Sequence, residues 1–311
     1  MENYITLFNF NYLPQGLTMF YSLKKYFPKS RLWVVCMDKK VENDLQKRNL
    51  PDLKTISLKE IENKNLKKVK KNRKFVEYCW TLTPFLPTYF FKKYKAAESI
   101  TYLDADIFFY NNPQPIIKEF KKSKKSILLT EHGFHTKQDV SHISGKFCVQ
   151  YMIFKNNKNS KKILEWWQEK CLDWCHDYPD KGRFGDQKYL DEWPKLFRKY
   201  IHIAKRKKFF QAPWTYNRFN TKDKIIYHFH GLKIDSYKVF IFNNYGFTKK
   251  IIKDIYIPYC KSLKISLDKI NFDFKQNVQN KNLLNQLKSY VKFKLFGYKN
   301  LYRFEFDLKN L

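Results

Sequence analysis

The segment Ile100-Thr101-Tyr102-Leu103-Asp104-Ala105-Asp106-Ile107-Phe108-Phe109 joins an apolar, β-branched run to two carboxylates and then to a second apolar run. We expect a strand that ends at this acidic pair. Side chains two residues apart in an extended chain point the same way, so Asp104 and Asp106 can bind one divalent cation. Carboxylate oxygens suit Mg²⁺ or Mn²⁺, and the small Ala105 leaves room for a diphosphate. The alternative is two solvated aspartates at a strand end.

The composition is that of a globular protein with a strong positive charge. The 311 residues can bury a substantial core, and the aromatic content of 19% excludes a disordered or fibrous chain. The net charge of +32 has two explanations. One is a lysine-rich compositional bias, and the other is binding to anionic partners such as nucleotide phosphates, an anionic membrane face or nucleic acid.

The N-terminal segment has an early acid and too short an apolar run for a signal peptide. No window approaches the roughly 20 apolar residues that cross a bilayer. We therefore expect a cytoplasmic protein whose six scattered cysteines stay reduced.

The first forty residues have the pattern of a strand, a helix and a second strand. The strands are expected at Tyr4 to Asn9 and Arg31 to Met37, and such a unit makes them parallel. Ligands of such sheets bind beyond the carboxyl ends of the strands, where Asn9, Tyr12 and Asp38 would lie. Tyr12 either stacks on a base or packs at the helix start. Asp38 either binds a base or ribose or caps the following helix.

Further strands are expected at Ser99 to Leu103, Ile127 to Thr130 and Phe147 to Phe154. Glu131 follows the second of these, where a general-base or acceptor-binding role competes with a structural one. The basic run from Lys64 to Lys74 has no apolar period and is interpreted as a solvated loop.

Two later motifs carry polar side chains suited to chemistry. A loop with two glycines places Asp186 and Gln187 near a helix N-terminus, where Asp186 can also be a simple N-cap. The β-branched run before His228 predicts a strand, and alternation places His228 and His230 on one side of it. Lys233 follows shortly after, so this segment is a candidate metal and phosphate site.

The pattern changes beyond about residue 243. We expect a catalytic domain over residues 1–242 and a basic, mostly helical appendage over residues 243–311. Lys281 to Phe296 has the spacing of an amphipathic basic helix, which would either dock on the domain or contact a membrane.

Taken in order, these motifs resemble the GT-A class of nucleotide-sugar glycosyltransferases, an α/β fold with a mixed, Rossmann-like sheet flanked by helices. The match extends to a bacterial group of sugar transferases associated with surface polysaccharides such as lipopolysaccharide and capsule. It covers roughly residues 1–239. The segments that carry it are Thr81-Leu82-Thr83-Pro84, Tyr102-Leu103-Asp104-Ala105-Asp106-Ile107, Gly145-Lys146-Phe147-Cys148-Val149-Gln150, Trp166-Trp167, Gly185-Asp186-Gln187-Lys188-Tyr189-Leu190-Asp191, Ala212-Pro213-Trp214 and His228-Phe229-His230-Gly231-Leu232-Lys233.

The resemblance implies a set of roles. Asp104 and Asp106 would hold Mn²⁺ or Mg²⁺ on the diphosphate of the donor, which is expected to be a UDP-sugar. His228 matches the late metal-binding histidine of the retaining galactosyl- and glucosyltransferase branch, and Lys233 falls near its phosphate-contacting lysine but out of register. The other assignments are Asp186 and Gln187 near the transferred sugar and acceptor, and Trp80 and Thr81, with Asn9, Tyr12, Asp38 and Ala105, at the donor.

Two departures from the group's pattern bear on acceptor and sugar selectivity. Cys148 stands where the group usually has Asn, and Thr215 stands where Asn is usual, with Asn217 two residues later. The implied acceptor is a glycan or lipid-linked glycan at the inner face of the cytoplasmic membrane, which the protein would meet by peripheral association. Retention of configuration is favoured over inversion by His228 alone.

Two other functions compete with glycosyl transfer. A basic nucleic-acid-binding protein explains the charge, but it calls for exposed aromatic residues among lysines, and the aromatic residues here lie in apolar runs. A sugar nucleotidyltransferase shares the fold but opens with a Gly-rich phosphate loop, and only Gly16 follows the first strand. Both are therefore disfavoured.

Overall fold

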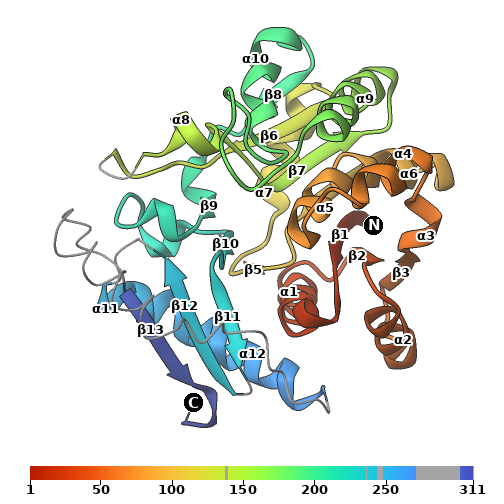
Figure 1. Cartoon of the computed structure of the whole chain (residues 1–311). Coiled ribbons are helices and arrows are strands. Elements are labelled where there is room, and N and C mark those ends of the chain that lie inside the picture. The colour runs from red at the N-terminus through yellow and green to blue at the C-terminus, as the bar shows by residue number, and fades with distance from the viewer. Residues whose placement is uncertain (137–138, 236, 244–247, 271–301, 311) are drawn as a thin grey trace.

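A seven-stranded mixed sheet forms the centre of the molecule, in the order β3-β2-β1-β4-β7-β6-β8 (Figure 1). The computed structural model describes residues 1–136, 139–235, 237–243, 248–270 and 302–310. The parallel part of the sheet consists of β1 (Glu2–Phe8), β2 (Ser30–Cys36), β3 (Leu53–Ser57) and β4 (Ser99–Leu103). Next to it, β7 (Phe147–Lys155) runs antiparallel to β4 and to β6 (Ile127–Glu131), and β8 (Ile201–Ile203) is parallel to β6.

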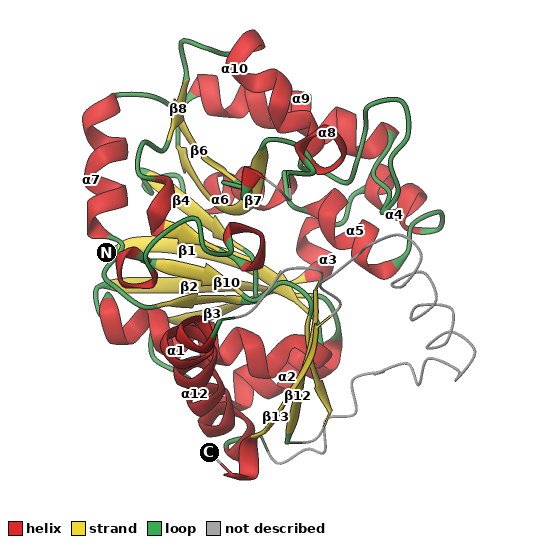
Figure 2. Ribbon diagram, turned by 90° about the vertical axis from the view of Figure 1, so that its left-hand side faces the viewer, coloured by secondary structure: helices red, strands yellow, loops and turns green. Residues whose placement is uncertain are grey.

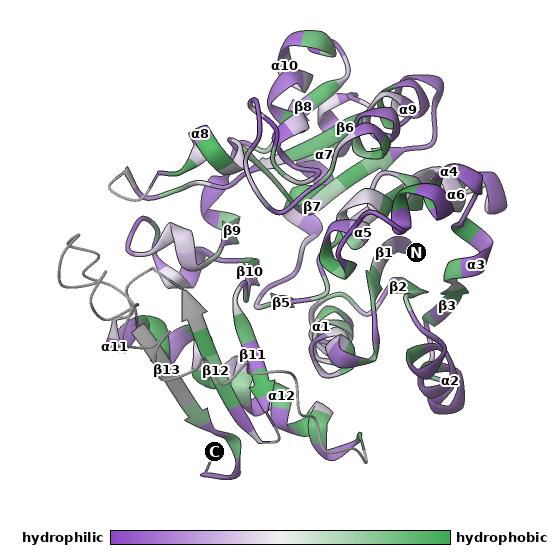
Figure 3. Ribbon diagram, viewed as in Figure 1, coloured by the Kyte–Doolittle hydropathy of each residue, from purple (hydrophilic) through white to green (hydrophobic). Residues whose placement is uncertain are grey.

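Alternation along the strands divides the core between the two faces of this sheet. In β1, Tyr4 and Phe8 belong to the core on the side of α1 (Leu13–Tyr26), whereas Ile5 and Leu7 belong to the core on the opposite side. Helices cover both faces (Figure 2), and in Figure 3 strand β6 is mostly hydrophobic while helices α2 and α4 are mostly hydrophilic. The predicted mixed sheet flanked by helices is confirmed. The remaining helices around the sheet are α2 (Lys39–Arg48), α3 (Leu58–Ile61), α6 (Phe85–Lys93), α7 (Gln114–Ser123), α8 (Ser141–Ser144), α9 (Lys158–Asp173) and α10 (Trp193–Leu196).

The prediction of a solvated loop for the basic run is wrong, because residues of this run form helix α4 (Lys64–Lys70). Helix α5 (Phe75–Leu82) comes next along the chain. The Asn63 side chain accepts a hydrogen bond from the Leu66 backbone N at 2.9 Å and so begins the helix. Leu66 is fully buried and Val69 is partly buried. One apolar side chain per turn is too sparse a signal to stand out among so many lysines.

Two smaller sheets complete the fold. In the first, β5 (Ile107–Phe109), β10 (Ile226–His228) and β9 (Phe210–Gln211) lie beside the acidic pair. The second is antiparallel and consists of β11 (Leu232–Asp235), β12 (Lys238–Asn243) and β13 (Tyr302–Asp307). Strand β13 therefore adds an extended segment to a tail that was predicted to be mostly helical.

The described residues beyond 243 share the core on the α1 side of the main sheet. Helix α12 (Ile257–Asp268) packs on α1, where the Thr18 hydroxyl donates to the Ser266 hydroxyl at 2.8 Å. Before it come α11 (Lys249–Ile251) and the π-helical turn η7 (Ile252–Tyr256). The domain division at residue 242 stays a prediction, and the basic helix predicted over Lys281 to Phe296 lies outside the described residues. Of the helices that are described, none has the length and apolarity needed to span a membrane.

Candidate functional site

The acidic pair and the late histidine meet at one point. Asp104 and Asp106 lie in the turn between β4 and β5, and β10 pairs with β5 so that His228 is opposite Ile107. This register places the His228 Nε2 atom 3.0 Å from Asp106 Oδ1 and 3.8 Å from Asp104 Oδ2. One potential ligand atom from each residue lies within 4.8 Å of the others. In the described part of the chain, this is the one cluster of three or more acidic, histidine or cysteine side chains that can hold a metal ion.

Burial and mutual repulsion give these groups unusual proton affinities. Burial, followed by the charge of Asp106, raises the pKa of Asp104 to about 6. Burial alone would also raise the pKa of Asp106, but the His228 imidazole holds it below its ordinary value. For His228, burial favours the neutral ring, yet the two carboxylates hold its pKa well above 6.5. Two carboxylates and an imidazole are a ligand set that fits Mn²⁺, and a cation would relieve the repulsion between the acids.

A proton must therefore compete with any cation at this site. We expect the Kd for Mn²⁺ to rise at least about tenfold as the pH falls from 7.5 to 5, because Asp104 becomes protonated below about pH 6. The proton on His228 acts in the same direction. Isothermal titration with MnCl₂ at several pH values measures this, and a Kd that does not change with pH would exclude Asp104 as a ligand.

Asp186 lies near enough to the same acids for the charge of Asp104 to act on its carboxyl. Its backbone carbonyl accepts a hydrogen bond from Trp167 Nε1 at 2.8 Å, and the residue is 4% exposed, with the Thr83 hydroxyl near its carboxyl. Burial, followed by the charge of Asp104, raises the pKa of Asp186 to about 8. Asp186 is not the N-cap of the following helix η3 (Lys188–Glu192), since Gln187 occupies that position without a capping hydrogen bond from its side chain.

Two residues of this cluster were absent from the sequence-based site. The Tyr102 hydroxyl donates to Asp104 Oδ1 at 2.9 Å, and the Thr83 hydroxyl, which donates to the Cys79 carbonyl at 3.3 Å, lies near both Tyr102 and Asp186. Thr83 belongs to a segment already noted for its resemblance, but nothing in the local spacing indicated that it would face an acid far along the chain. From the sequence, Tyr102 was interpreted only as part of an apolar strand.

Of the residues predicted at the carboxyl ends of β1 and β2, Tyr12 lies near the acids. Burial, followed by the charge of Asp106, raises the pKa of the Tyr12 hydroxyl, which places it close to that carboxylate. Asn9 Oδ1 is buried and has no hydrogen-bond partner among the described residues, so it is open to a ligand. Asp38 has the capping role: its two oxygens accept hydrogen bonds from the backbone N of Val41 at 2.8 Å and of Phe10 at 2.9 Å.

The residues predicted on α5 and in the acidic turn are placed differently from one another. Trp80 is half-buried under Gly185, where an added Cβ would come within 3.3 Å of the indole ring. Thr81 is fully buried, and its hydroxyl donates to the Glu77 carbonyl at 2.8 Å, so Thr81 supports the helix and has no surface toward a donor. Ala105 is half-buried and packs against the core on the α1 side.

Glu131 and Lys233 lie at the edges of this region. Glu131 is held by two lysines, with its carboxylate 2.5 Å from Lys207 Nζ and 3.6 Å from Lys146 Nζ. This pairing agrees with the structural interpretation of Glu131. Lys233 lies on β11, and it is near enough to His230 that its charge, after burial and the charge of His228, contributes to lowering the pKa of His230 to about 4.

The aromatic ring of Trp214 packs against His228. The Trp214 ring lies edge-on to His228 at 5.2 Å and to His230 at 5.8 Å, and its Nε1 donates to the His132 carbonyl at 2.8 Å. Cys148, where the resembling group has Asn, is buried in the same cluster, and burial raises the pKa of its thiol. Trp214 was noted only as part of a motif, and its contact with His228 depends on tertiary packing.

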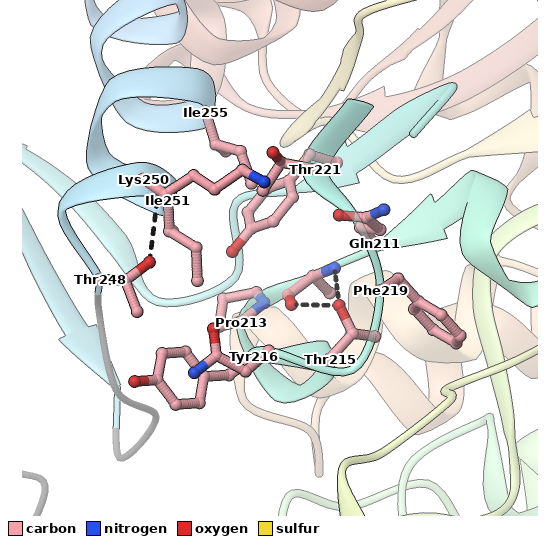
Figure 4. A pocket seen from close by; sticks show the side chains of 13 residues that line it. Gln211, Pro213, Thr215, Tyr216, Phe219, Thr221, Thr248, Lys250, Ile251 and Ile255 are labelled. Atoms are coloured by element: carbon pink, nitrogen blue, oxygen red, sulfur yellow. Dashed lines mark hydrogen bonds between the residues drawn. The ribbon is translucent and has the colours of Figure 1, made fainter. Parts of the chain in front are cut away.

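A separate pocket of about 120 Å³ lies under the segment that contains Thr215 (Figure 4). The Thr215 hydroxyl bonds back to the Ala212 backbone, accepting from N at 3.1 Å and donating to O at 2.9 Å. Tyr227 lines this pocket while its neighbour His228 faces the acids, as alternation along β10 requires. The other lining residues are Gln211, Ala212, Pro213, Tyr216, Asn217, Phe219, Thr221, Thr248, Lys250, Ile251 and Ile255.

Comparison with known proteins decides the family. The model of glycosyl transferase family 8 matches residues 3–178. This chain belongs to glycosyl transferase family 8. Two uncharacterized proteins of Bacillus subtilis (strain 168) support the assignment. YfnF is 31% identical over 258 residues, covering 75% of this chain and 82% of YfnF, and YfnD is 30% identical over 278 residues, covering 83% and 87%.

Solved structures of glycosyltransferases share the fold. GlyE of Streptococcus pneumoniae TIGR4 superposes with a TM-score of 0.53 at 14% identity, covering 86% of this chain and 62% of GlyE. An active-site mutant of LgtC superposes with a TM-score of 0.52 at 12% identity, covering 74% and 87%. The family 8 member is thus a nucleotide-sugar glycosyltransferase with a GT-A fold, as the resemblance implied. The family assignment disfavours the nucleic-acid-binding and nucleotidyltransferase alternatives.

Proposed function

We propose that this family 8 enzyme transfers a hexose from a UDP-sugar, with Mn²⁺ held by Asp104, Asp106 and His228. The convergence of these three side chains from distant parts of the chain, with ligand atoms within 4.8 Å, is the observation that carries the proposal. The mixed oxygen and nitrogen ligand set favours Mn²⁺ over the harder Mg²⁺. The match of His228 to the metal-binding histidine of the galactosyl- and glucosyltransferase branch supports a hexose as the transferred group.

The chemistry requires stabilisation of a nucleoside diphosphate leaving group. A bound divalent cation would supply Lewis-acid stabilisation of its developing negative charge. Tyr102 orients the Asp104 carboxylate by its 2.9 Å hydrogen bond, and Lys233 on β11 adds positive charge near His230. We assign Asn9, whose Oδ1 is buried without a hydrogen-bond partner, and the half-buried Tyr12 to the nucleoside.

The remaining residues would serve the sugar and the acceptor. Asp186 adjoins the acids and Gln187 follows it, so we assign both to the transferred sugar and the acceptor hydroxyl. Glu131 is a weaker candidate for a general base, because two lysines already pair with its carboxylate. We propose retention of configuration, in keeping with the retaining branch that His228 matches.

For the acceptor, we propose a surface glycan or a lipid-linked glycan of a bacterium. The B. subtilis relatives support a bacterial setting. The net charge of +32 supports peripheral binding to the anionic inner face of the membrane, with the basic segment Lys281 to Phe296 as a contact.

A donor panel tests the proposal. The enzyme is incubated with UDP-, GDP-, CMP- and ADP-sugars, with Mn²⁺ or with EDTA, and release of the nucleotide is measured. We expect release from a UDP-hexose at least about tenfold faster with Mn²⁺ than with EDTA, and NMR of the released or transferred sugar should show a retained anomeric configuration. Equal release with EDTA would contradict the role of the metal, and release from no donor would contradict the proposed activity.

A further inference from the structure

A buried carboxylate outside the proposed site is bonded to the loop that carries Asp186 and Gln187. Glu77 lies on α5, and its side chain is 3% exposed. One oxygen, Oε2, accepts from the Lys74 backbone N at 2.8 Å and lies 3.2 Å from His176 Nδ1. The other, Oε1, accepts from the Asp177 backbone N at 3.1 Å. Burial alone would raise the pKa of Glu77, but these hydrogen bonds hold it below its ordinary value, so the carboxylate is charged.

The tautomer of His176 follows from its second partner. His176 Nε2 lies 3.0 Å from Arg73 Nη1. Because a guanidinium only donates, Nε2 must accept, and the ring hydrogen is on Nδ1, where it points to Glu77. Arg73 also donates to the Leu172 carbonyl at 3.4 Å, at the end of α9. The chain of contacts Arg73–His176–Glu77 therefore joins the start of α5 to the segment that leaves α9.

A backbone hydrogen bond links residues 176 and 177, which Glu77 contacts, to the residue before Asp186. The Gly185 backbone N donates to the His176 carbonyl at 2.9 Å, which closes the base of the intervening loop. Gly185 has a φ of +52° and sits against Trp80, one helical turn after Glu77. Helix α5 thus fixes both ends of the closed loop, Glu77 at residues 176 and 177 and Trp80 at residue 185.

Resting on the proposed function, we infer that Glu77 is a positioning residue, whose buried contacts with His176 and Asp177 hold the loop so that the Asp186 carboxyl meets the acids at Asp104. Glu77 itself touches neither donor nor acceptor. Its removal should therefore impair turnover without weakening the binding of UDP and Mn²⁺, because those ligands are assigned to the turn after β4, to β10 and to the segment that follows β1.

Glu77→Gln tests this with little change in shape. Both carboxylate oxygens of Glu77 accept hydrogen bonds, and the variant replaces one of them with an NH₂ group, which can only donate. At least one of these hydrogen bonds is therefore lost. We expect kcat for the preferred donor to fall about 10- to 100-fold, while the Kd for UDP with Mn²⁺ stays within about twofold of wild type. Hydrogen–deuterium exchange of peptides over residues 176–187 should also accelerate.

The matched control is Glu62→Gln. Glu62 is also a sheltered carboxylate bonded to α5, since it accepts from the Tyr78 hydroxyl at 2.7 Å and pairs with Lys70, but no contact links it to the loop within the described residues. The Glu62→Gln variant should leave kcat and the hydrogen–deuterium exchange of residues 176–187 unchanged. An equal loss of kcat in both variants would overturn the inference, because it would reflect general destabilisation of α5.

If Glu77→Gln does not fold, two variants of His176 test the same inference. His176→Asn keeps a donor near the Nδ1 position and should retain most turnover, whereas His176→Leu should behave like Glu77→Gln. Wild-type turnover in His176→Leu would overturn the inference. If wild-type enzyme turned over no donor, the proposed activity would fail, and the exchange measurement would still decide whether Glu77 holds the loop.

Discussion

Asp104→Asn combined with Asp106→Asn should lower kcat/KM for metal-dependent transfer by at least about 10³-fold. The two substitutions keep the side-chain volumes but remove both negative charges that would hold the cation. They remove both the repulsion between the two acids and the ion pair of Asp106 with His228, so the two effects on stability oppose each other and the double variant should stay folded without metal. Steady-state kinetics and thermal denaturation without metal measure the loss of transfer and the stability.

A charge-matched control separates this effect from a general loss of negative charge. Glu165→Gln combined with Glu169→Gln removes two carboxylates from the outer face of α9, where both residues are exposed. This variant should keep wild-type kinetics. Transfer that stays intact and metal-dependent in the Asp104 and Asp106 double variant would contradict the mechanism.

Asp186→Asn should lower kcat about 10²-fold and leave the affinity for UDP with Mn²⁺ within about twofold of wild type. With a pKa near 8, the Asp186 carboxyl is largely protonated at neutral pH before ligands bind, and Asn is close to that neutral form in shape. The variant therefore tests whether the ionised carboxylate is needed for turnover. Pre-steady-state kinetics and titration with UDP measure the two quantities.

Either of two results would contradict the assignment of Asp186 to the transfer step. One is a wild-type kcat in Asp186→Asn, which would mean that a neutral hydrogen-bonding group suffices. The other is a loss confined to UDP affinity, which would move Asp186 to the nucleotide side of the site. Thr83→Val, which removes the hydroxyl near Asp186, should lower kcat less than Asp186→Asn.

The sequence predicted the parts of this site that depend on strand ends. Asp104 and Asp106 follow a β-branched run, and His228 ends another, so their placement at strand ends followed from alternation and from the order of the elements. The 3.0 Å contact between His228 and Asp106 could not be predicted from strand ends alone, because it depends on the antiparallel register of β10 with β5. Only the resemblance to known transferases had placed His228 with the acids.

Other parts were invisible in the sequence for a physical reason. Glu77 and His176 are 99 positions apart in the chain and meet only because α5 packs beside the segment that leaves α9. Asp38 presented two roles that spacing could not separate, and the structure shows it capping α2. Helix α4 was missed because helix formation there depends on one N-cap, the buried Leu66 and the partly buried Val69.

Titration of UDP into the wild-type enzyme with and without Mn²⁺ is the most direct test of the claim that Asp104, Asp106 and His228 hold a cation on a nucleoside diphosphate. The account predicts that Mn²⁺ lowers the Kd for UDP by at least about tenfold, a coupling of about 1.4 kcal/mol. It also predicts that this gain is lost in the Asp104→Asn, Asp106→Asn double variant. Equal UDP affinity with and without Mn²⁺ in the wild-type enzyme would contradict it.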